Sequence, residues 1–305
     1  MTKSHQQILD NGMALFKKYT SSLDGWQLTS EKNGVKLYSR KPDNPNEPVL
    51  VRGECEYTEA KDVRPVDLST CAIFPSARRV WDSRFEDSEV RMIRSRYSYI
   101  CYARSKPNWP VKPRDFSTIT YREVTEDATY LGIFSIEDET LIPQVEGYVR
   151  ATILCSGWKF AKNENGKGLK LTYISQIDFK GTVPPVIVKA VMQQIPLCAY
   201  RVKQYHEKYG FPPTTTNITA HFLGEEFQHE KATYVLKLDK HPSNSQSKNT
   251  ADILCCRDMF SKGLDIAIHG DADYDVVDQG IHKLVRIFNV QALTTVYIVG
   301  KKKNK

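Results

Sequence analysis

The segment spanning residues 184–209 constrains the fold of this chain more than any other. Read at helical spacing, apolar side chains recur every three or four positions and form one stripe, made of Ile187, Val191, Ile195, Cys198, Val202 and Tyr205. Pro184 and Pro185 suit the first turn of a helix, and Gly210 ends it. At about 1.5 Å per residue the helix is roughly 35–40 Å long. It therefore spans a small domain and must bury its stripe against another layer.

Pro196 lies in the middle of this segment. A proline inside a helix removes one backbone hydrogen bond and clashes with the carbonyl four residues earlier, so we expect a kink or a short 3₁₀ break there. Two interpretations stay open. Either the bent helix packs permanently on a core, or it is a lid that opens at Pro196.

The length of 305 residues suits one large core and a smaller one, with room for a cavity. Hydrophobic residues make up 40% and charged residues 26%, as in ordinary globular proteins, and no apolar run is long enough to cross a bilayer. The N-terminus lacks a signal-peptide pattern, and the seven cysteines are odd in number without CxxC spacing. We therefore expect a cytoplasmic protein with reduced thiols.

Part of the net charge of +7 is local, because a basic tail contains Lys301, Lys302, Lys303 and Lys305. Such a tail either attracts an anionic membrane or nucleic acid, or is a solvated end. Arginines also cluster between residues 78 and 104, mixed with aromatic residues, which is one pattern of single-stranded nucleic-acid binding. Acidic residues interrupt this cluster. We interpret it as salt-bridged surface strands and predict no nucleic-acid partner.

The order of the predicted elements indicates an α+β domain with an antiparallel sheet. After a leading helix, a hairpin is expected over residues 26–39, and further strands at 49–58, 90–102, 115–124, 129–135, 147–158 and 169–180. After Pro213 short strands follow one another, including one over residues 217–227. We predict one domain over residues 1–213 and a smaller, mostly β domain over residues 214–305.

Motifs for metal or nucleophilic chemistry are incomplete. His206-Glu207 lacks the second histidine of a zinc protease, since Gly210 stands there. Asp271, Asp273 and Asp275 have the spacing of a calcium loop without its glycine and glutamate, so we interpret them as a solvated acidic turn. The cysteines in apolar patterns have no histidine neighbours and are read as structural thiols. We expect no metal, no cofactor and no enzymatic activity.

The segment from Pro110 to Phe116 stands out. Its two prolines fix an extended approach to a strand that begins at Arg114 and Asp115, whose side chains then point to opposite faces and to different partners. A buried arginine or aspartate must be paired. Structural pairing is the simplest interpretation of both.

These residues belong to a wider resemblance to the START (steroidogenic-acute-regulatory-related lipid transfer) family over residues 26–209. The matching motifs are Gly34-Val35-Lys36-Leu37-Tyr38, Arg79-Val80-Trp81-Asp82, Lys112-Pro113-Arg114-Asp115-Phe116, Gly147-Tyr148-Val149-Arg150-Ala151, Gly157-Trp158 and Gln176-Ile177-Asp178-Phe179-Lys180-Gly181. Within them, the resemblance implies structural roles for Trp81, Asp82, Arg114, Asp115, Arg150 and Asp178.

The resemblance implies a helix-grip fold, in which a curved antiparallel sheet grips the long C-terminal helix around a tunnel for one lipid. The loop over residues 137–146 and the helix would form a gate at the membrane. Sterol-binding members commonly have an acidic and a basic residue at the places held here by Cys101 and Thr120. Neither is charged, which speaks against the usual recognition of a sterol hydroxyl.

Strand parity then predicts the cavity wall. The lipid-facing residues are Tyr99, Cys101, Phe116, Thr118, Thr120 and Arg122 on the strands and Ile187, Val191, Ile195, Cys198 and Val202 on the helix. Arg122 either binds a phosphate head group, which guanidinium engages bidentately, or forms a surface salt bridge.

The function predicted from the sequence is binding and transfer of a single phospholipid or sterol-like lipid in an apolar tunnel. The protein would be cytoplasmic and peripheral at membranes. As an alternative, it is a lipid sensor whose residues 214–305 engage a protein or membrane partner.

Overall fold

The computed structural model describes residues 4–107, 111–242 and 249–301. It contains two compact units, the first made of Met1–Ser69 and Trp81–Gln204 and the second of Thr70–Val80 and Tyr205–Lys305. The predicted basic tail beyond Lys301 lies outside the described residues. The segment Thr70–Val80, which the sequence places in the first domain, thus groups with the second unit.

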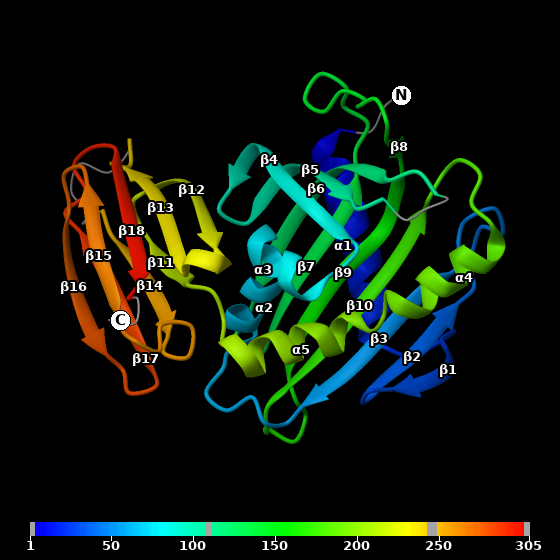
Figure 1. The fold of residues 1–305 in the computed structure, drawn as a ribbon, viewed down its shortest axis with the longest axis horizontal. Coiled ribbons are helices and arrows are strands. Elements are labelled where there is room, and N and C mark those ends of the chain that lie inside the picture. The colour runs from blue at the N-terminus through cyan, green and yellow to red at the C-terminus, as the bar shows by residue number, and fades with distance from the viewer. Residues whose placement is uncertain (1–3, 108–110, 243–248, 302–305) are drawn as a thin grey trace. The chain divides into compact units, whose positions relative to one another are not determined.

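The first unit is built on a ten-stranded sheet (Figure 1), antiparallel except where β8 pairs with β6. The strand order is β1-β2-β3-β10-β9-β7-β6-β5-β4, with β8 beside β6. The strands are β1 (Gln27–Lys32), β2 (Val35–Arg40), β3 (Leu50–Tyr57), β4 (Phe85–Ser95), β5 (Ser98–Ser105), β6 (Arg114–Val124), β7 (Ala128–Ser135), β8 (Val149–Arg150), β9 (Thr152–Lys162) and β10 (Leu169–Asp178).

One prediction about this sheet is wrong. The expected single strand over residues 90–102 is a hairpin, β4 and β5, with Ser95 paired to Ser98 around a tight turn at Arg96 and Tyr97. The turn contains no glycine, proline or asparagine, so its composition gave no signal for it.

Helix α1 (His5–Ser21) covers one face of the sheet and begins with a capping box between Ser4 and Gln7. Phe16 and Phe134 belong to the core that α1 forms with the strands. The helix approaches the sheet closely, because a Cβ added at Gly157 would lie 2.3 Å from the Leu131 carbonyl oxygen and 2.9 Å from the Phe16 ring. Gly157 is therefore required by the packing of α1.

The opposite face is covered by the helical segment predicted for residues 184–209, as Figure 1 shows. It consists of α4 (Pro185–Gln194) and α5 (Cys198–Tyr209), separated at Pro196, which confirms the expected break. Where the two helices meet they touch the sheet, since a Cβ on Gly53 would lie 2.2 Å from the Pro196 carbonyl oxygen. None of the ten residues of α4, all of them described, is fully buried. The fold is thus α+β, with a curved antiparallel sheet gripping a C-terminal helix.

The second unit contains two four-stranded antiparallel sheets. One consists of β11 (Thr214–Ile218), β14 (Ala251–Cys256), β17 (His282–Phe288) and β16 (Asp273–Asp278), the other of β12 (His221–Gln228), β13 (Thr233–Asp239), β18 (Thr294–Gly300) and β15 (Leu264–His269). The fully buried Tyr234 of β13 donates to Glu225 at 2.6 Å and lies 2.8 Å from the Thr215 hydroxyl on β11. This contact ties the two sheets together.

Two predictions for this unit need correction. The strand expected over residues 217–227 is two strands, β11 and β12. The aspartates at 273 and 275 lie in β16, an exposed edge strand paired with β17, and not in an acidic turn. Their alternate spacing is the period of a strand. Among the described residues no group of three or more side chains could hold a metal ion.

The second unit also includes the helical segment Thr70–Val80, which contains the last four residues of α2 (Pro65–Ile73) and the first six of α3 (Pro75–Trp81). The Phe74 ring lies 5.9 Å from Phe227 and 6.2 Å from Tyr234, measured between centroids. The Ser76 hydroxyl donates to the Phe227 carbonyl and accepts from the His229 amide at 3.2 Å. The β domain is therefore completed by residues from early in the chain.

Replacing Gly157 by alanine should lower the free energy of unfolding of the first unit by about 2 kcal/mol, since the new methyl group overpacks the contact between α1 and the sheet. Urea denaturation followed by tryptophan fluorescence measures it, because Trp26, Trp81 and Trp158 belong to the first unit. Lys162→Ala on the same strand, in an exposed ion pair, is the control and should change stability by less than about 1 kcal/mol. An unchanged midpoint for Gly157→Ala would contradict the close packing.

Candidate functional site

Strand register shows which face of the sheet the predicted cavity residues occupy, because paired residues in an antiparallel sheet point the same way. Tyr99 pairs with Thr120 and Cys101 with Thr118. On the same face, residues paired from one strand to the next connect β6 with β3. The pairs are Arg122–Leu131, Leu131–Trp158, Trp158–Tyr173 and Tyr173–Gly53. Gly53 contacts the break at Pro196. The predicted strand residues therefore lie on the face covered by the C-terminal helices.

Aromatic side chains fill the centre of this face. Trp158 stacks on Tyr173 with centroids 4.3 Å apart and on Phe160 at 5.6 Å. Trp81 meets Trp158 edge-on at 5.9 Å. The middle of the grip is thus packed, and space for a ligand lies elsewhere on the face.

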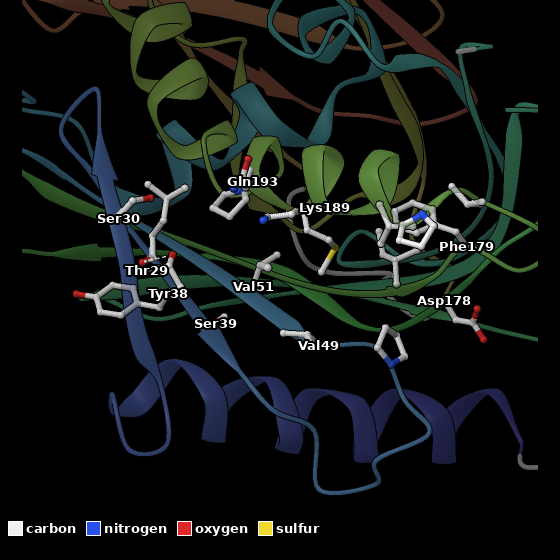
Figure 2. A pocket seen from close by; sticks show the side chains of 18 of the residues that line it. Thr29, Ser30, Tyr38, Ser39, Val49, Val51, Asp178, Phe179, Lys189 and Gln193 are labelled. Carbon is white, nitrogen blue, oxygen red and sulfur yellow. Dashed lines mark hydrogen bonds between the residues drawn. The ribbon is translucent and has the colours of Figure 1, made fainter. Parts of the chain in front are cut away.

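A pocket of about 740 Å³ opens between α4 and the β1, β2, β3 and β10 side of the sheet (Figure 2). Its lining is mainly apolar. The apolar lining residues are Leu37, Pro48, Val49, Val51, Ile177, Phe179, Val183, Pro185, Val188, Met192 and Pro196, and the others are Thr29, Ser30, Tyr38, Ser39, Asp178, Lys180, Gly181, Lys189 and Gln193. Its size is that of a site for one small-molecule or lipid ligand, about 300–1,000 Å³.

The charged residues of the pocket are Asp178 at the end of β10, Lys180 in the linker to α4, and Lys189 on α4. The Lys180 ammonium lies 2.6 Å from the Asp178 carboxylate. Burial raises the pKa of Asp178, but the hydrogen bonds and charge of Lys180 lower it more, so this pKa is below its ordinary value. Lys189 and Gln193 lie on the helix side (Figure 2). The pocket therefore combines an apolar wall with charge on one side.

The eleven residues predicted to contact lipid are not among those that line this pocket. Ile195, Cys198 and Val202 are buried, and Ile187 and Val191 are half-buried. The α4 residues that do line the pocket, Val188 and Met192 among them, follow the predicted positions by one residue. Contact of the predicted set with a ligand stays a prediction.

Sequence reasoning missed the β1 and β2 residues of the pocket. They lie in the first hairpin. Every residue of its strand β1 is exposed, so the strand has no alternation of apolar and polar residues that would indicate a buried face. The turn itself was predictable, since Asn33 and Gly34 have φ of 54° and 71°.

Cys101 and Thr120 occupy the two positions where sterol-binding members of the resembled family commonly have an acidic and a basic residue. Burial raises the pKa of the Cys101 thiol to about 12, so it is neutral at physiological pH. The Thr120 hydroxyl donates to the Tyr99 carbonyl at 3.4 Å. This part of the face is polar only through weak, neutral groups.

Arg114 and Asp115 point in opposite directions and bind different segments. The buried Arg114 guanidinium donates to the carbonyls of Phe179 at 3.0 Å and Lys180 at 2.9 Å, and also to Lys112. The carbonyls of Phe179 and Lys180 belong to the linker that leads from β10 into α4. Arg114 thus fixes the point from which the helix over the pocket begins.

The Asp115 carboxylate forms a bidentate pair with Arg150, with both oxygen–nitrogen distances 2.9 Å. Arg150 in turn donates to the carbonyls of Ile142 at 3.3 Å and Pro143 at 3.0 Å. Both lie in the loop predicted over residues 137–146. Asp115 therefore holds that loop through Arg150.

The chain matches the START domain family over residues 6–201. The chain belongs to this family. One similar solved structure is human STARD10, with 19% sequence identity and a TM-score of 0.56; the match covers 68% of this chain and 82% of STARD10. Another is human StAR-related lipid transfer protein 5, with 21% sequence identity and a TM-score of 0.56; the match covers 67% of this chain and 100% of that protein. No curated protein matches the chain by sequence. START domains bind and transfer lipids, and no helix in the described part of the chain is long and apolar enough to cross a membrane.

Trp81 ends α3, and Asp82 follows it before β4. Asp82 is buried and accepts from the Arg84 Nε at 3.1 Å. The other arm of Arg84 reaches the Cys198 sulfur at 3.1 Å. Asp82 thus orients an arginine that contacts the first residue of α5.

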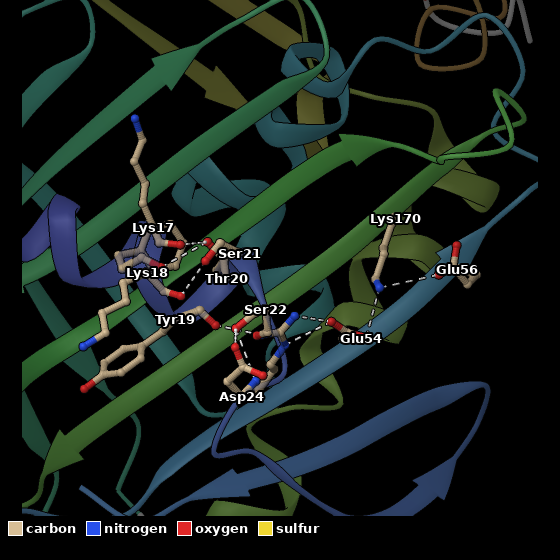
Figure 3. A network of polar contacts seen from close by, with 12 residues as sticks. Lys17, Lys18, Tyr19, Thr20, Ser21, Ser22, Asp24, Glu54, Glu56 and Lys170 are labelled. Carbon is tan, nitrogen blue, oxygen red and sulfur yellow. Dashed lines mark hydrogen bonds and ion pairs between the residues drawn. The ribbon is translucent and has the colours of Figure 1, made fainter. Parts of the chain in front are cut away.

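Arg52 is a buried arginine of this START domain whose guanidinium donates hydrogen bonds to a carboxylate and to two carbonyls. Its guanidinium donates to Glu54, with Nε–Oε1 at 3.0 Å, and to the carbonyls of Tyr19 and Ser22 at 2.7 and 2.8 Å. Glu54 also binds Lys170, whose ammonium reaches Glu54 and Glu56 in Figure 3. Burial raises the pKa of Glu54, but Arg52 and Lys170 lower it further than burial raises it. Arg52 thereby caps the carboxyl end of α1.

Replacing Asp115 by asparagine should loosen the loop over residues 137–146, because Arg150 loses the charge that holds it. A lost charge-assisted hydrogen bond costs about 1.5–3 kcal/mol, so amide hydrogen exchange in this loop should speed up by about tenfold or more. Asp127→Asn, which alters an exposed pair with Lys162, serves as the control. Unchanged exchange at the Ile142 amide would show that the pair does not restrain the loop.

Proposed function

We propose that this protein binds one lipid in the apolar pocket beneath α4 and transfers it between membranes without altering it chemically. The observation that carries the proposal is the 740 Å³ pocket, found at the C-terminal helix of a START domain. Each buried CH₂ group is worth about 0.8 kcal/mol, so a lipid chain needs a dry apolar wall of this kind to leave a bilayer. The ligand is a phospholipid or a sterol-like lipid.

Helix α4 is suited to act as the gate. It buries no residue fully, Val186 is 72% exposed, and Arg114 anchors only the linker before it. Pro196 separates it from α5, which does bury residues on the sheet. We infer that α4 swings about Pro196 at a membrane surface, together with the loop over residues 137–146, and that the protein works in the cytoplasm.

The test places a charge in the pocket wall. Met192→Glu should slow the transfer of a fluorescent lipid between vesicles by more than tenfold, because a charge in the apolar wall disfavours the binding of acyl chains there. Leu23→Glu, at a residue 44% exposed and outside the pocket lining, is the matched control and should transfer at the wild-type rate. Equal transfer by both variants would rule out this pocket as the lipid site.

A second test addresses the hinge. Pro196→Ala should leave the affinity for lipid within about twofold and change the rate of exchange between vesicles, since it restores the helical hydrogen bond that a proline lacks. Stopped-flow exchange measures the rate and equilibrium partitioning the affinity. An unchanged rate would contradict the hinge role.

A further inference from the structure

Three arginines of this chain are almost fully buried, and they differ in how their donors are used. Arg52, Arg114 and Arg122 are 3%, 6% and 5% exposed. Arg52 pairs with Glu54 and two carbonyls, and Arg114 donates to three carbonyls. For Arg122, no hydrogen bond of the side chain and no ion pair is formed with any residue that the structure describes.

The guanidinium of Arg122 lies near an aromatic ring. Its central carbon lies 5.7 Å from the Tyr97 ring centroid, and its own backbone amide donates to the Tyr97 carbonyl at 2.8 Å. Its Nε atom is buried with no partner within the described residues. A surface salt bridge, one of the two interpretations of Arg122 from the sequence, is thereby excluded.

A second orphaned polar atom lies beside Arg122. The hydroxyl of Thr129, which is 0% exposed, is also buried without a partner in the described part of the chain. Thr129 lies two residues before Leu131, the partner of Arg122 across β6 and β7. Such diagonal neighbours lie about 7–8 Å apart at their Cα atoms, and alternation puts Thr129 on the same face as Leu131. Arg122 and Thr129 thus place two buried polar groups, without hydrogen-bond partners in the described part of the chain, on the same face of the sheet.

Burying an unpaired charge is costly, so a guanidinium kept in this way calls for an anion. A carboxylate keeps all of its acceptor sites in one plane, which the planar arginine fork shares when it binds both oxygens. A phosphate group has further oxygens directed away from that plane, which a hydroxyl on the neighbouring strand can meet. The donor set therefore favours phosphate.

We propose that Arg122 and Thr129 form a binding site for the phosphate group of the ligand, which makes the ligand a phospholipid with an accessible phosphate. This inference rests on the proposed lipid-binding function. The site is separate from the apolar pocket, which is lined from β1, β2, β3, β10 and α4. On the shared face of the sheet, four strand-to-strand steps, or roughly 19 Å, separate Arg122 from Gly53 at the Pro196 break. The Trp158 and Tyr173 rings lie between the two sites on this face, so a ligand that occupies both must run along these rings.

The experiment compares two lipids that differ only in the phosphate. The full chain is incubated with phosphatidylcholine vesicles that contain phosphatidic acid and diacylglycerol with identical acyl chains, and extracted lipid is measured by mass spectrometry. Arg122→Met should reduce the extracted ratio of phosphatidic acid to diacylglycerol by at least about tenfold, and Thr129→Val by a few-fold. The matched control is Arg91→Met, whose exposed arginine pairs with Glu89, and it should keep the wild-type ratio.

Two further measurements separate the explanations. Thermal melting should show Arg122→Met unfolding at or above the wild-type temperature, because the variant removes an unpaired buried charge, whereas a structural arginine would give a clear drop. Calorimetry with glycerol 3-phosphate tests whether a free phosphate compound binds without acyl chains. Binding abolished by Arg122→Met would support the site and identify that source.

The possible failures are distinguishable. If wild-type protein extracts lipid but the ratio is the same in Arg122→Met, the phosphate site is wrong and the transfer function stands. If Arg122→Met melts well below wild type, a structural role replaces the proposed one. If neither lipid is extracted and glycerol 3-phosphate does not bind, both the site and the proposed function fail.

Discussion

The first unit depends on two adjacent residues, Arg114 and Asp115, whose side chains leave the same strand in opposite directions. Arg114 binds the carbonyls of the linker into α4, and Asp115 holds Arg150 and through it the carbonyls at 142 and 143. The alternation of a β-strand is what allows one dipeptide to restrain two distant segments. Phe179 and Lys180 of the linker line the pocket beneath α4, so the same point of the sheet restrains the edge of the pocket and the loop over residues 137–146.

The face of the sheet that α4 and α5 cover is packed unevenly. Its centre is filled by Trp158 and the rings around it, while the space beneath α4 is a pocket. Packed aromatic rings make the middle of the sheet rigid, and α5 is anchored there by buried residues. Helix α4 has no fully buried residue, so a weakly packed helix covers the pocket.

Much of this could be predicted from the sequence, for reasons that particular residues make clear. The stripe from Ile187 to Tyr205, the break at Pro196 and the Asn33-Gly34 turn are local patterns, and each appears in the structure. The position of the pocket is not local, because it depends on how β1 and β2 lie against α4. The hairpin at Arg96 and Tyr97 was missed because nothing in its composition breaks a strand. The unpaired state of Arg122 follows from the absence of a carboxylate near it among the described residues, which only coordinates can reveal.

The grouping of Thr70–Val80 with the second unit has a consequence for biosynthesis. The hydrogen bond from the Ser76 hydroxyl to the Phe227 carbonyl joins residues 151 positions apart in sequence. During translation, Phe74 and its neighbours leave the ribosome long before the strands that bury them. Phe74 therefore lacks its aromatic partners until residues 227 and 234 have been synthesised, so the second unit cannot be completed before then.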